Sequence, residues 1–276
     1  GLPALAITIC TFITVSVMNA ASYAFADNGP SVIAYARLWY TLPYSFLAIP
    51  ITTALFTELS DMYAEGDLAG VMRAMESGTS QILFLLIPFA LYLIVFSGPL
   101  VTLYHTGAFA EDRISQIAGF LAALALALPF YGVVAHMQKV FSSIRRLGIF
   151  ALFNVIASAV QVALTLGAAY GFQQGRAIPI ESIAWASAAF YLVCDILCLI
   201  YLKAAFGGFK LVPILRAVLW GAGLGASGAL AGGCVLFGLQ MLLGAFETQI
   251  WAAAICVVVG GCASLAVTFG IALAAQ

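Results

Sequence analysis

The sequence predicts an all-α polytopic membrane protein with eight transmembrane helices, and three observations lead to that class. Of the 276 residues, 64% are hydrophobic and 8% are charged, which is more apolar surface than a water-soluble core could bury. The apolar residues fall into eight stretches, each long enough to cross a bilayer, for which about 20 residues suffice. The runs are continuously apolar instead of alternating as barrel strands do, so helices are the spanning structure that fits.

The eight predicted spans are joined by short polar connections. They are Leu2–Ala26, Val32–Leu59, Gly78–Tyr104, Ile114–Met137, Gly148–Phe172, Ser182–Leu202, Pro213–Leu239 and Thr248–Ala275. The segment at about 61–76 is too polar to span and predicts an amphipathic helix on the membrane surface. We expect two domains: a six-helix bundle over residues 1–202, which includes that surface helix, and two additional C-terminal transmembrane helices over residues 203–276.

The first span carries a row of hydroxyl and amide side chains. Spacings of three and four place most of them on one stripe of the helix: Thr8, Thr11, Thr14, Ser16, Asn19 and Ser22. Such groups inside a bilayer usually hydrogen-bond to a neighbouring helix. A polar wall of an aqueous cavity is the alternative, and it makes Asn19 a candidate substrate-binding residue.

The second span contains one arginine and two internal prolines. Arg37 lies near its start and is costly to expose to lipid, so it is expected to face a cavity, a partner or the headgroups. Pro43 and Pro50 each remove a backbone donor, and therefore predict kinks. A kinked helix with a lone cation is a suitable wall for a site that handles an anion.

Several motifs resemble one family of membrane transporters. Ala34-Tyr35-Ala36-Arg37-Leu38, followed by Leu42-Pro43 and Ile51-Thr52-Thr53-Ala54-Leu55, is similar to the eighth transmembrane helix of the MurJ/MviN lipid II flippases. The Gly107-Ala108-Phe109 loop with Asp112 resembles the family's connection between its ninth and tenth helices. The family usually has an acid directly before the arginine, where this chain has Ala36, and Pro50 is an extra proline.

The resemblance implies an architecture and a function. The chain would correspond to helices seven to fourteen of a transporter of the MOP exporter superfamily: its second lobe and two extra helices. The substrate would be lipid II, the polyprenyl diphosphate-linked peptidoglycan precursor, flipped across the bacterial cytoplasmic membrane by alternating access. We expect no enzymatic activity, and membrane lipids and a first lobe of the same protein as partners. On that basis the chain is expected to be a piece of a longer protein.

Two later spans contain polar residues that require an explanation. Asn154, Ser158 and Gln161 fall on nearly one face of the fifth span, where they could line the same cavity. Apart from Glu58 near the end of the second span, Asp195 in the sixth span is the one acid deep in an apolar run, and it is a candidate for substrate binding or ion coupling. A protonated or hydrogen-bonded carboxyl between helices is an equally good interpretation.

The remaining polar and sulfur chemistry is sparse. The six cysteines lie in apolar runs, without the four-ligand spacing of a zinc site, and are interpreted as packing residues. The two histidines, His105 and His136, are interpreted as solvated side chains. We expect no metal and no cofactor. The net charge of −1 argues against a nucleic-acid partner.

The last two spans are rich in glycine. Gly221, Gly225, Gly228 and Gly232 include two Gly-x-x-x-Gly spacings, which permit close approach of helices. In the resembling family these helices flank a groove proposed to hold the lipid tail. Ordinary tight packing is at least as good an interpretation.

Basic residues predict the orientation. The connections after the second, fourth and sixth spans carry most of the lysines and arginines, which places them, with both chain ends, in the cytoplasm. They are Arg73, Lys139, Arg145, Arg146, Lys203, Lys210 and Arg216.

Other functions remain open at this stage. A MATE-like cation-coupled exporter of drugs or polysaccharide lipids would have a polar cavity with an essential carboxylate, for which Asp195 is the candidate. A membrane enzyme acting on lipid-linked sugars would need clustered acids or a metal at the membrane face, and the acids here are sparse. A non-transporting membrane scaffold would explain the missing acid before Arg37.

Overall fold

The structure is a computed structural model, and it describes residues 1–104, 111–171, 178–244 and 249–274. All regular elements among these residues are helical. In chain order they are α1 (Leu2–Ser22), α2 (Gly29–Pro43), the π-helix η1 (Tyr44–Ala48), α3 (Ile49–Ala64), α4 (Leu68–Val95), α5 (Ser97–Thr102), α6 (Glu111–Ala125), α7 (Leu128–Ser143), α8 (Leu147–Leu166), the π-helix η2 (Gly167–Gly171), α9 (Glu181–Ala205), α10 (Leu211–Leu243) and α11 (Ile250–Ala274).

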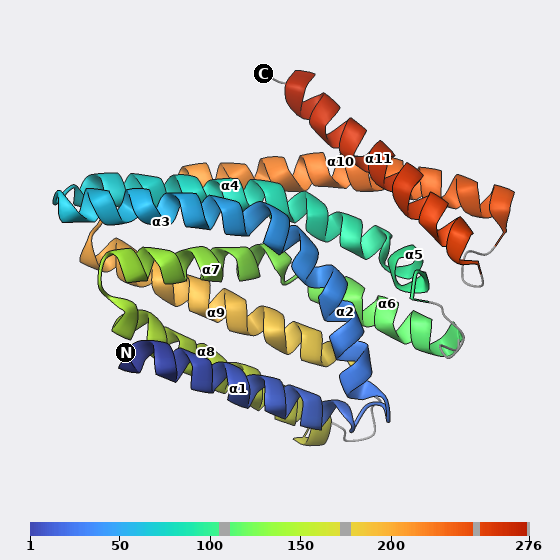
Figure 1. Cartoon of the computed structure of the whole chain (residues 1–276), viewed down its shortest axis with the longest axis horizontal. Coiled ribbons are helices and arrows are strands. Elements are labelled where there is room, and N and C mark those ends of the chain that lie inside the picture. Colours follow the sequence, from blue (N-terminus) through green and yellow to red (C-terminus); the bar gives the residue numbers. More distant parts are fainter. Residues whose placement is uncertain (105–110, 172–177, 245–248, 275–276) are drawn as a thin grey trace.

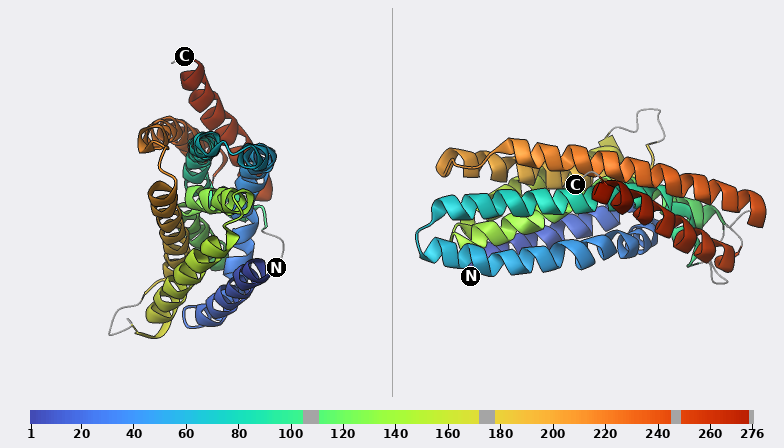
Figure 2. Two further views of the ribbon diagram at one scale, coloured as in Figure 1. Left: turned by 90° about the vertical axis from the view of Figure 1, so that its left-hand side faces the viewer. Right: turned by 90° about the horizontal axis from the view of Figure 1, so that it is seen from above.

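The helices form an elongated bundle in which most axes follow the long direction of the molecule (Figures 1 and 2). Seven helices in the described part of the chain are long and apolar enough to cross a membrane, with α2, η1 and α3 counted as one. The pair α6 and α7 passes the same test together and is bent by 51°. Counting that pair as one broken span gives eight, which confirms the predicted number.

The second span is kinked where the prolines predicted it. Between Pro43 and Pro50 the chain forms the π-helix η1, whose end is marked by the Ile49 N–H bonding to the Tyr44 carbonyl, five residues back. Proline lacks the N–H that the regular ladder requires, and its ring displaces the carbonyl four residues earlier, so the wider turn takes up the mismatch. The result is one helix from Gly29 to Ala64 that bends between α2 and α3 (Figure 1).

The predicted surface helix over about 61–76 is wrong. The helix α3 ends at Ala64 and α4 already begins at Leu68, so the segment is a tight helical hairpin and the third span starts ten residues earlier than expected. Gly66 makes the turn possible with φ of +82°, and Asp67 caps α4 by accepting a hydrogen bond from the Gly70 N–H at 2.7 Å. Val71, Met72 and Met75 of the segment are buried against the protein itself.

Two other predicted spans are interrupted. The third span breaks at Phe96, where α4 gives way to the short α5. The fourth, expected as one helix over Ile114–Met137, is divided between α6 and α7. Pro129 lies in the first turn of α7, a position that suits its missing N–H, and so the chain changes direction just before it.

The glycines of α10 allow close packing against two neighbours. A Cβ at Gly225 would lie 2.7 Å from the Cα of Pro88 in α4, and one at Gly228 would lie 2.6 Å from the Ser264 carbonyl of α11. Only glycine permits these approaches without displacing backbone, so the packing interpretation of the two Gly-x-x-x-Gly spacings is confirmed. The division into domains at residue 202 remains a prediction.

The predicted basic connections lie together at one end of the bundle. The turns between α3 and α4, α7 and α8, and α9 and α10 all lie at the left of Figure 1, beside the N-terminus. They carry Arg145, Arg146 and Lys210, among others. This arrangement agrees with the expected topology, while the side of the membrane to which that end belongs remains a prediction.

Candidate functional site

Arg37 lies half-buried on α2 and faces hydroxyl groups inside the bundle. Its guanidinium lies within electrostatic reach of the hydroxyls of Tyr191 on α9, of Tyr40 and of Tyr131. Among the described residues the one ion pair is between Arg73 and Asp67, 3.6 Å apart and exposed. The positive charge of Arg37 is therefore not neutralised by a carboxylate in the described part of the chain.

The hydroxyls around Arg37 belong to a group of four tyrosines, here called the tyrosine cluster: Tyr40, Tyr44, Tyr131 and Tyr191. The Tyr131 ring lies at its centre, with centroid distances of 5.6 Å to Tyr40, 4.3 Å to Tyr44 and 5.2 Å to Tyr191. Tyr40 is 1% exposed, and its hydroxyl lies near that of Tyr191 but makes no hydrogen bond of regular geometry among the described residues. Buried phenols normally find a well-placed partner, so this part of the bundle holds unused hydrogen-bonding capacity.

The cluster forms where two irregular helices bend. Tyr44 is the first residue of η1, and Tyr131 lies two residues after Pro129, just beyond the bend between α6 and α7. The regular helix α9 supplies Tyr191, so three spans far apart in sequence meet around one guanidinium. Bends of this type allow helices to change shape, and π-turns are frequent at functional sites.

The structure places Asp195 in the interior but not in contact with Arg37. Asp195 is 5% exposed, and neither of its carboxylate oxygens has a hydrogen-bond partner among the described residues. It lies one helical turn beyond Tyr191 on α9, between Cys194 and the buried Cys198. The structure confirms that Asp195 is buried. Its role in substrate binding remains a prediction.

Asn19 and the polar residues of α8 differ in burial. Asn19 is half-buried on α1, and its side chain makes no hydrogen bond within the described residues. On α8 the expected cavity lining is wrong: Asn154, Ser158 and Gln161 are all buried by neighbouring helices. Gln161 donates a hydrogen bond to the Ser187 hydroxyl of α9 at 3.1 Å, which makes this face a polar seam between two packed helices.

The hydroxyls of α1 are bonded within their own helix. Thr8, Thr11 and Thr14 each donate to a backbone carbonyl three or four residues earlier, at 3.0 Å. Bonds across to a neighbouring helix, which the packing interpretation required, are not made by these three. Thr8 and Thr11 are exposed, so this part of α1 presents a polar stripe to its surroundings.

The interpretation of His136 as a solvated side chain is wrong. His136 is fully buried, and its Nε2 lies 3.3 Å from the Met75 carbonyl of α4. The extension of α4 toward its N-terminus, which the sequence did not predict, is what covers it. His105 and the Gly107-Ala108-Phe109 loop lie outside the described residues. The six cysteines are free, and Cys194, Cys198 and Cys256 are buried as packing residues.

These features define a class: a polytopic α-helical membrane protein whose bent, arginine-bearing second span meets a cluster of phenols inside the bundle. A sequence profile of the family described as "Lipid II flippase MurJ" matches residues 2–231. The chain therefore belongs to the MurJ family.

Curated relatives carry the same name. The chain is 25% identical over 119 residues to the "Probable lipid II flippase MurJ" of Rickettsia prowazekii, which covers 43% of this chain and 24% of the relative. Identity to the protein of that name from Borreliella burgdorferi is 21% over 210 residues, covering 76% of this chain and 40% of the relative. The "Lipid II flippase MurJ" of Thermosipho africanus is 28% identical over 112 residues, covering 40% and 22%.

A solved structure has the same fold. "Lipid II flippase MurJ, inward closed conformation" superimposes with a TM-score of 0.64 at 21% sequence identity. The superposition covers 97% of this chain and 51% of the solved chain, so the chain spans about half the length of that protein.

Proposed function

We propose that this chain is the second lobe, with two further C-terminal helices, of a flippase that moves lipid II across the bacterial cytoplasmic membrane. The observation that carries the proposal is Arg37: a half-buried guanidinium on a bent helix, without a counterion in the described residues and surrounded by tyrosine hydroxyls. Family membership supplies the substrate class, and the site supplies a means of holding its diphosphate.

The chemistry of a diphosphate matches this arrangement. A guanidinium stays charged at any depth and can hold two phosphate oxygens by paired hydrogen bonds. Moving a diphosphate through hydrocarbon without such partners would be prohibitive, so polar groups must replace its water. The hydroxyls of the tyrosine cluster are donors within reach of the same point. Asn19, half-buried on α1, and Asp195, buried on α9, are proposed as further substrate-binding residues.

The transport cycle requires a second wall. We propose that a first lobe outside these 276 residues closes the cavity, because the chain covers 51% of the solved MurJ chain. Rocking of one lobe against the other would expose Arg37 to alternate sides. Within the described residues, we expect this lobe to change shape at η1 and at the bend between α6 and α7. With the basic connections inside, both ends of this chain are cytoplasmic.

The test is replacement of Arg37 in the full-length protein. Arg37→Ala should lower lipid II flipping by about ten- to a hundredfold, because a charge-assisted contact in a partly buried site contributes ~1.5–3 kcal/mol. Arg37→Lys should also impair flipping, since a point charge cannot bind bidentately. The readouts are lipid II translocation in proteoliposomes and complementation of flippase-depleted cells, both at equal protein level.

A matched control variant tests whether loss of any arginine, and not of Arg37 in particular, lowers flipping. Arg73→Ala removes an exposed arginine whose single ion partner is Asp67, and it should flip lipid II at the parental rate. Parental transport by Arg37→Ala would exclude the proposed substrate contact and would leave Arg37 as a side chain that reaches the headgroups.

A further inference from the structure

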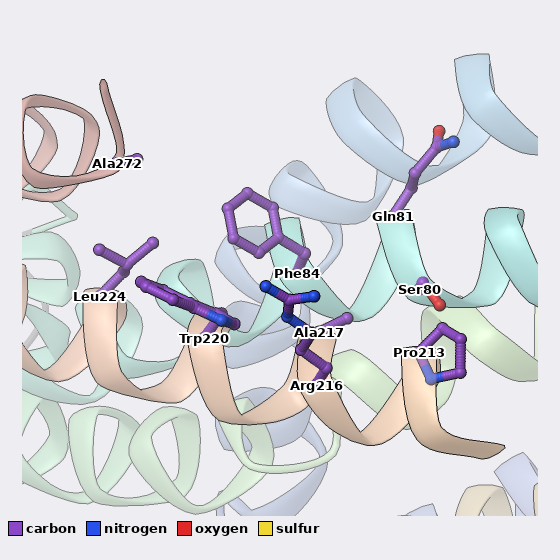
Figure 3. Close-up of a pocket in the computed structure, with 9 residues that line it drawn as sticks. All are labelled: Ser80, Gln81, Phe84, Pro213, Arg216, Ala217, Trp220, Leu224 and Ala272. Atoms are coloured by element: carbon purple, nitrogen blue, oxygen red, sulfur yellow. The ribbon is translucent and has the colours of Figure 1, made fainter. Parts of the chain in front are cut away.

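A groove lined by α4, α10 and α11, which supply none of the four tyrosines of the tyrosine cluster, contains an arginine. The groove has a volume of about 470 Å³ and is bounded by α4, α10 and the C-terminal part of α11. Figure 3 shows the Arg216 side chain beside Phe84 of α4 and Trp220 of α10. A second recess of about 330 Å³ shares Trp220 and Leu224 and continues along the seam between α10 and α11.

Arg216 has no acidic partner among the described residues. The carboxylate of Glu76, on the neighbouring end of α4, accepts a hydrogen bond from the Lys210 backbone N–H at 2.7 Å and fastens the start of α10 to α4. The Lys203 ammonium group donates a hydrogen bond to the Phe209 carbonyl at 2.8 Å. The guanidinium of Arg216 is therefore an exposed cation at the head of an apolar groove.

The length of α10 and the position of Arg216 in its second turn are those expected for a side chain at the level of the lipid phosphates. The helix α10 has 33 residues, about 50 Å at 1.5 Å per residue, and so exceeds the roughly 30 Å hydrocarbon thickness. Arg216 is the sixth residue of α10 and lies at the end of the bundle where the basic connections gather. At that level a phosphate is in reach, while Trp220 and Leu224, one and two turns deeper, lie where acyl chains begin.

We propose that this groove binds one anionic phospholipid, with its phosphate on Arg216 and an acyl chain along Trp220 and Leu224. An uncompensated cation above an apolar groove is complementary to a lipid with a net negative headgroup, and a zwitterionic headgroup brings its own cation and loses that advantage. The exposed aromatic ring at the boundary of polar and apolar surface suits the interface. The inference does not rest on the proposed flipping, because binding is measured without transport.

The experiment uses the quenching of Trp220 fluorescence by brominated lipids in the full-length protein. In a variant with every other tryptophan replaced by phenylalanine, brominated phosphatidylglycerol should associate about fivefold more strongly than brominated phosphatidylcholine, the preference expected for one basic residue. A second variant that retains only Trp251 is the control, since that side chain is 55% exposed against 45% for Trp220 and lies on α11, a helix whose residues include no arginine or lysine. It should show no headgroup preference.

Two substitutions test the contact itself. Arg216→Gln should abolish the preference at Trp220, and Arg216→Lys should retain it, because one phosphate needs charge more than fork geometry. Unchanged size-exclusion profiles would show that the variants are folded. Equal quenching of Trp220 by both brominated lipids would overturn the proposal. Relief of quenching by one equivalent of lipid II in excess phosphatidylglycerol would also overturn it, because the groove would then belong to the substrate.

Discussion

Arg37 and Arg216 are both arginines within helices long enough to span a membrane, and neither has a carboxylate partner among the described residues. Their surroundings differ. Arg37 is half-buried and meets phenol hydroxyls from three spans, whereas Arg216 is exposed and lies above an apolar groove. The comparison shows that position alone does not assign a role to a membrane arginine. The groups within reach decide whether it serves a polar cavity or the lipid boundary.

Residues 1–276 expressed alone should separate the two arginines most completely. The site around Arg37 needs a second wall to enclose a diphosphate, so we expect no lipid II flipping by this piece in liposomes. The groove at Arg216 is formed by α4, α10 and α11 alone, and so its preference for anionic lipid should remain. The measurements are lipid II translocation and tryptophan quenching, made on protein whose helical circular dichroism and elution profile show that it is folded.

Either of two results would break this comparison. Translocation of lipid II by residues 1–276 at the rate of the full-length protein would mean that this lobe encloses the substrate by itself. Loss of the headgroup preference in folded protein would mean that the groove depends on a part of the protein outside this chain.

The number of spans and the position of Arg37 on a proline-kinked helix could be predicted from the sequence, because both depend on local composition. The connections could not. The polar segment after Ser60 resembles a surface helix, yet a single glycine with positive φ turns it into a hairpin in which Val71, Met72 and Met75 are buried by tertiary packing. The same packing covers His136, which a sequence pattern places in solvent.

The tyrosine cluster was also beyond sequence reasoning. Its members lie on α2, η1, α7 and α9, and tyrosines inside apolar runs are normal packing residues. A usable signal was present in Pro43 and Pro129, since each lies one or two residues before a tyrosine of the cluster. The groove at Arg216 had no such signal, because it depends on how α10 and α11 diverge, and Figure 1 shows α11 crossing α10 obliquely.

The next prediction concerns the packing beside the groove, with two glycines of α10 as a matched pair. Gly225→Ala should destabilise the protein by about 1–3 kcal/mol, because its Cβ would lie 2.7 Å from the Pro88 Cα and force α10 away from α4. A Cβ at Gly223 would meet no neighbouring atom within 4 Å, so Gly223→Ala should be neutral or stabilise by up to about 1 kcal/mol. Thermal unfolding in detergent measures both, and equal midpoints for the two variants would contradict the close approach of α4 and α10.

The smallest expected effect concerns the hydroxyls around Arg37. Tyr191→Phe removes a hydroxyl beside the guanidinium and keeps the ring, so it should lower flipping by about two- to tenfold, the effect of one ordinary hydrogen bond. Tyr40→Phe is the control from the same cluster, because its buried hydroxyl makes no regular hydrogen bond in the described residues and its loss removes none. If the Tyr40 hydroxyl is idle, transport by Tyr40→Phe stays parental and its stability is unchanged or higher. If the Tyr40 hydroxyl instead binds the diphosphate during transport, Tyr40→Phe should flip lipid II as slowly as Tyr191→Phe, while its unfolding midpoint does not fall. Lipid II translocation and thermal unfolding of both variants therefore decide whether the cluster only orients Arg37 or also contacts the substrate.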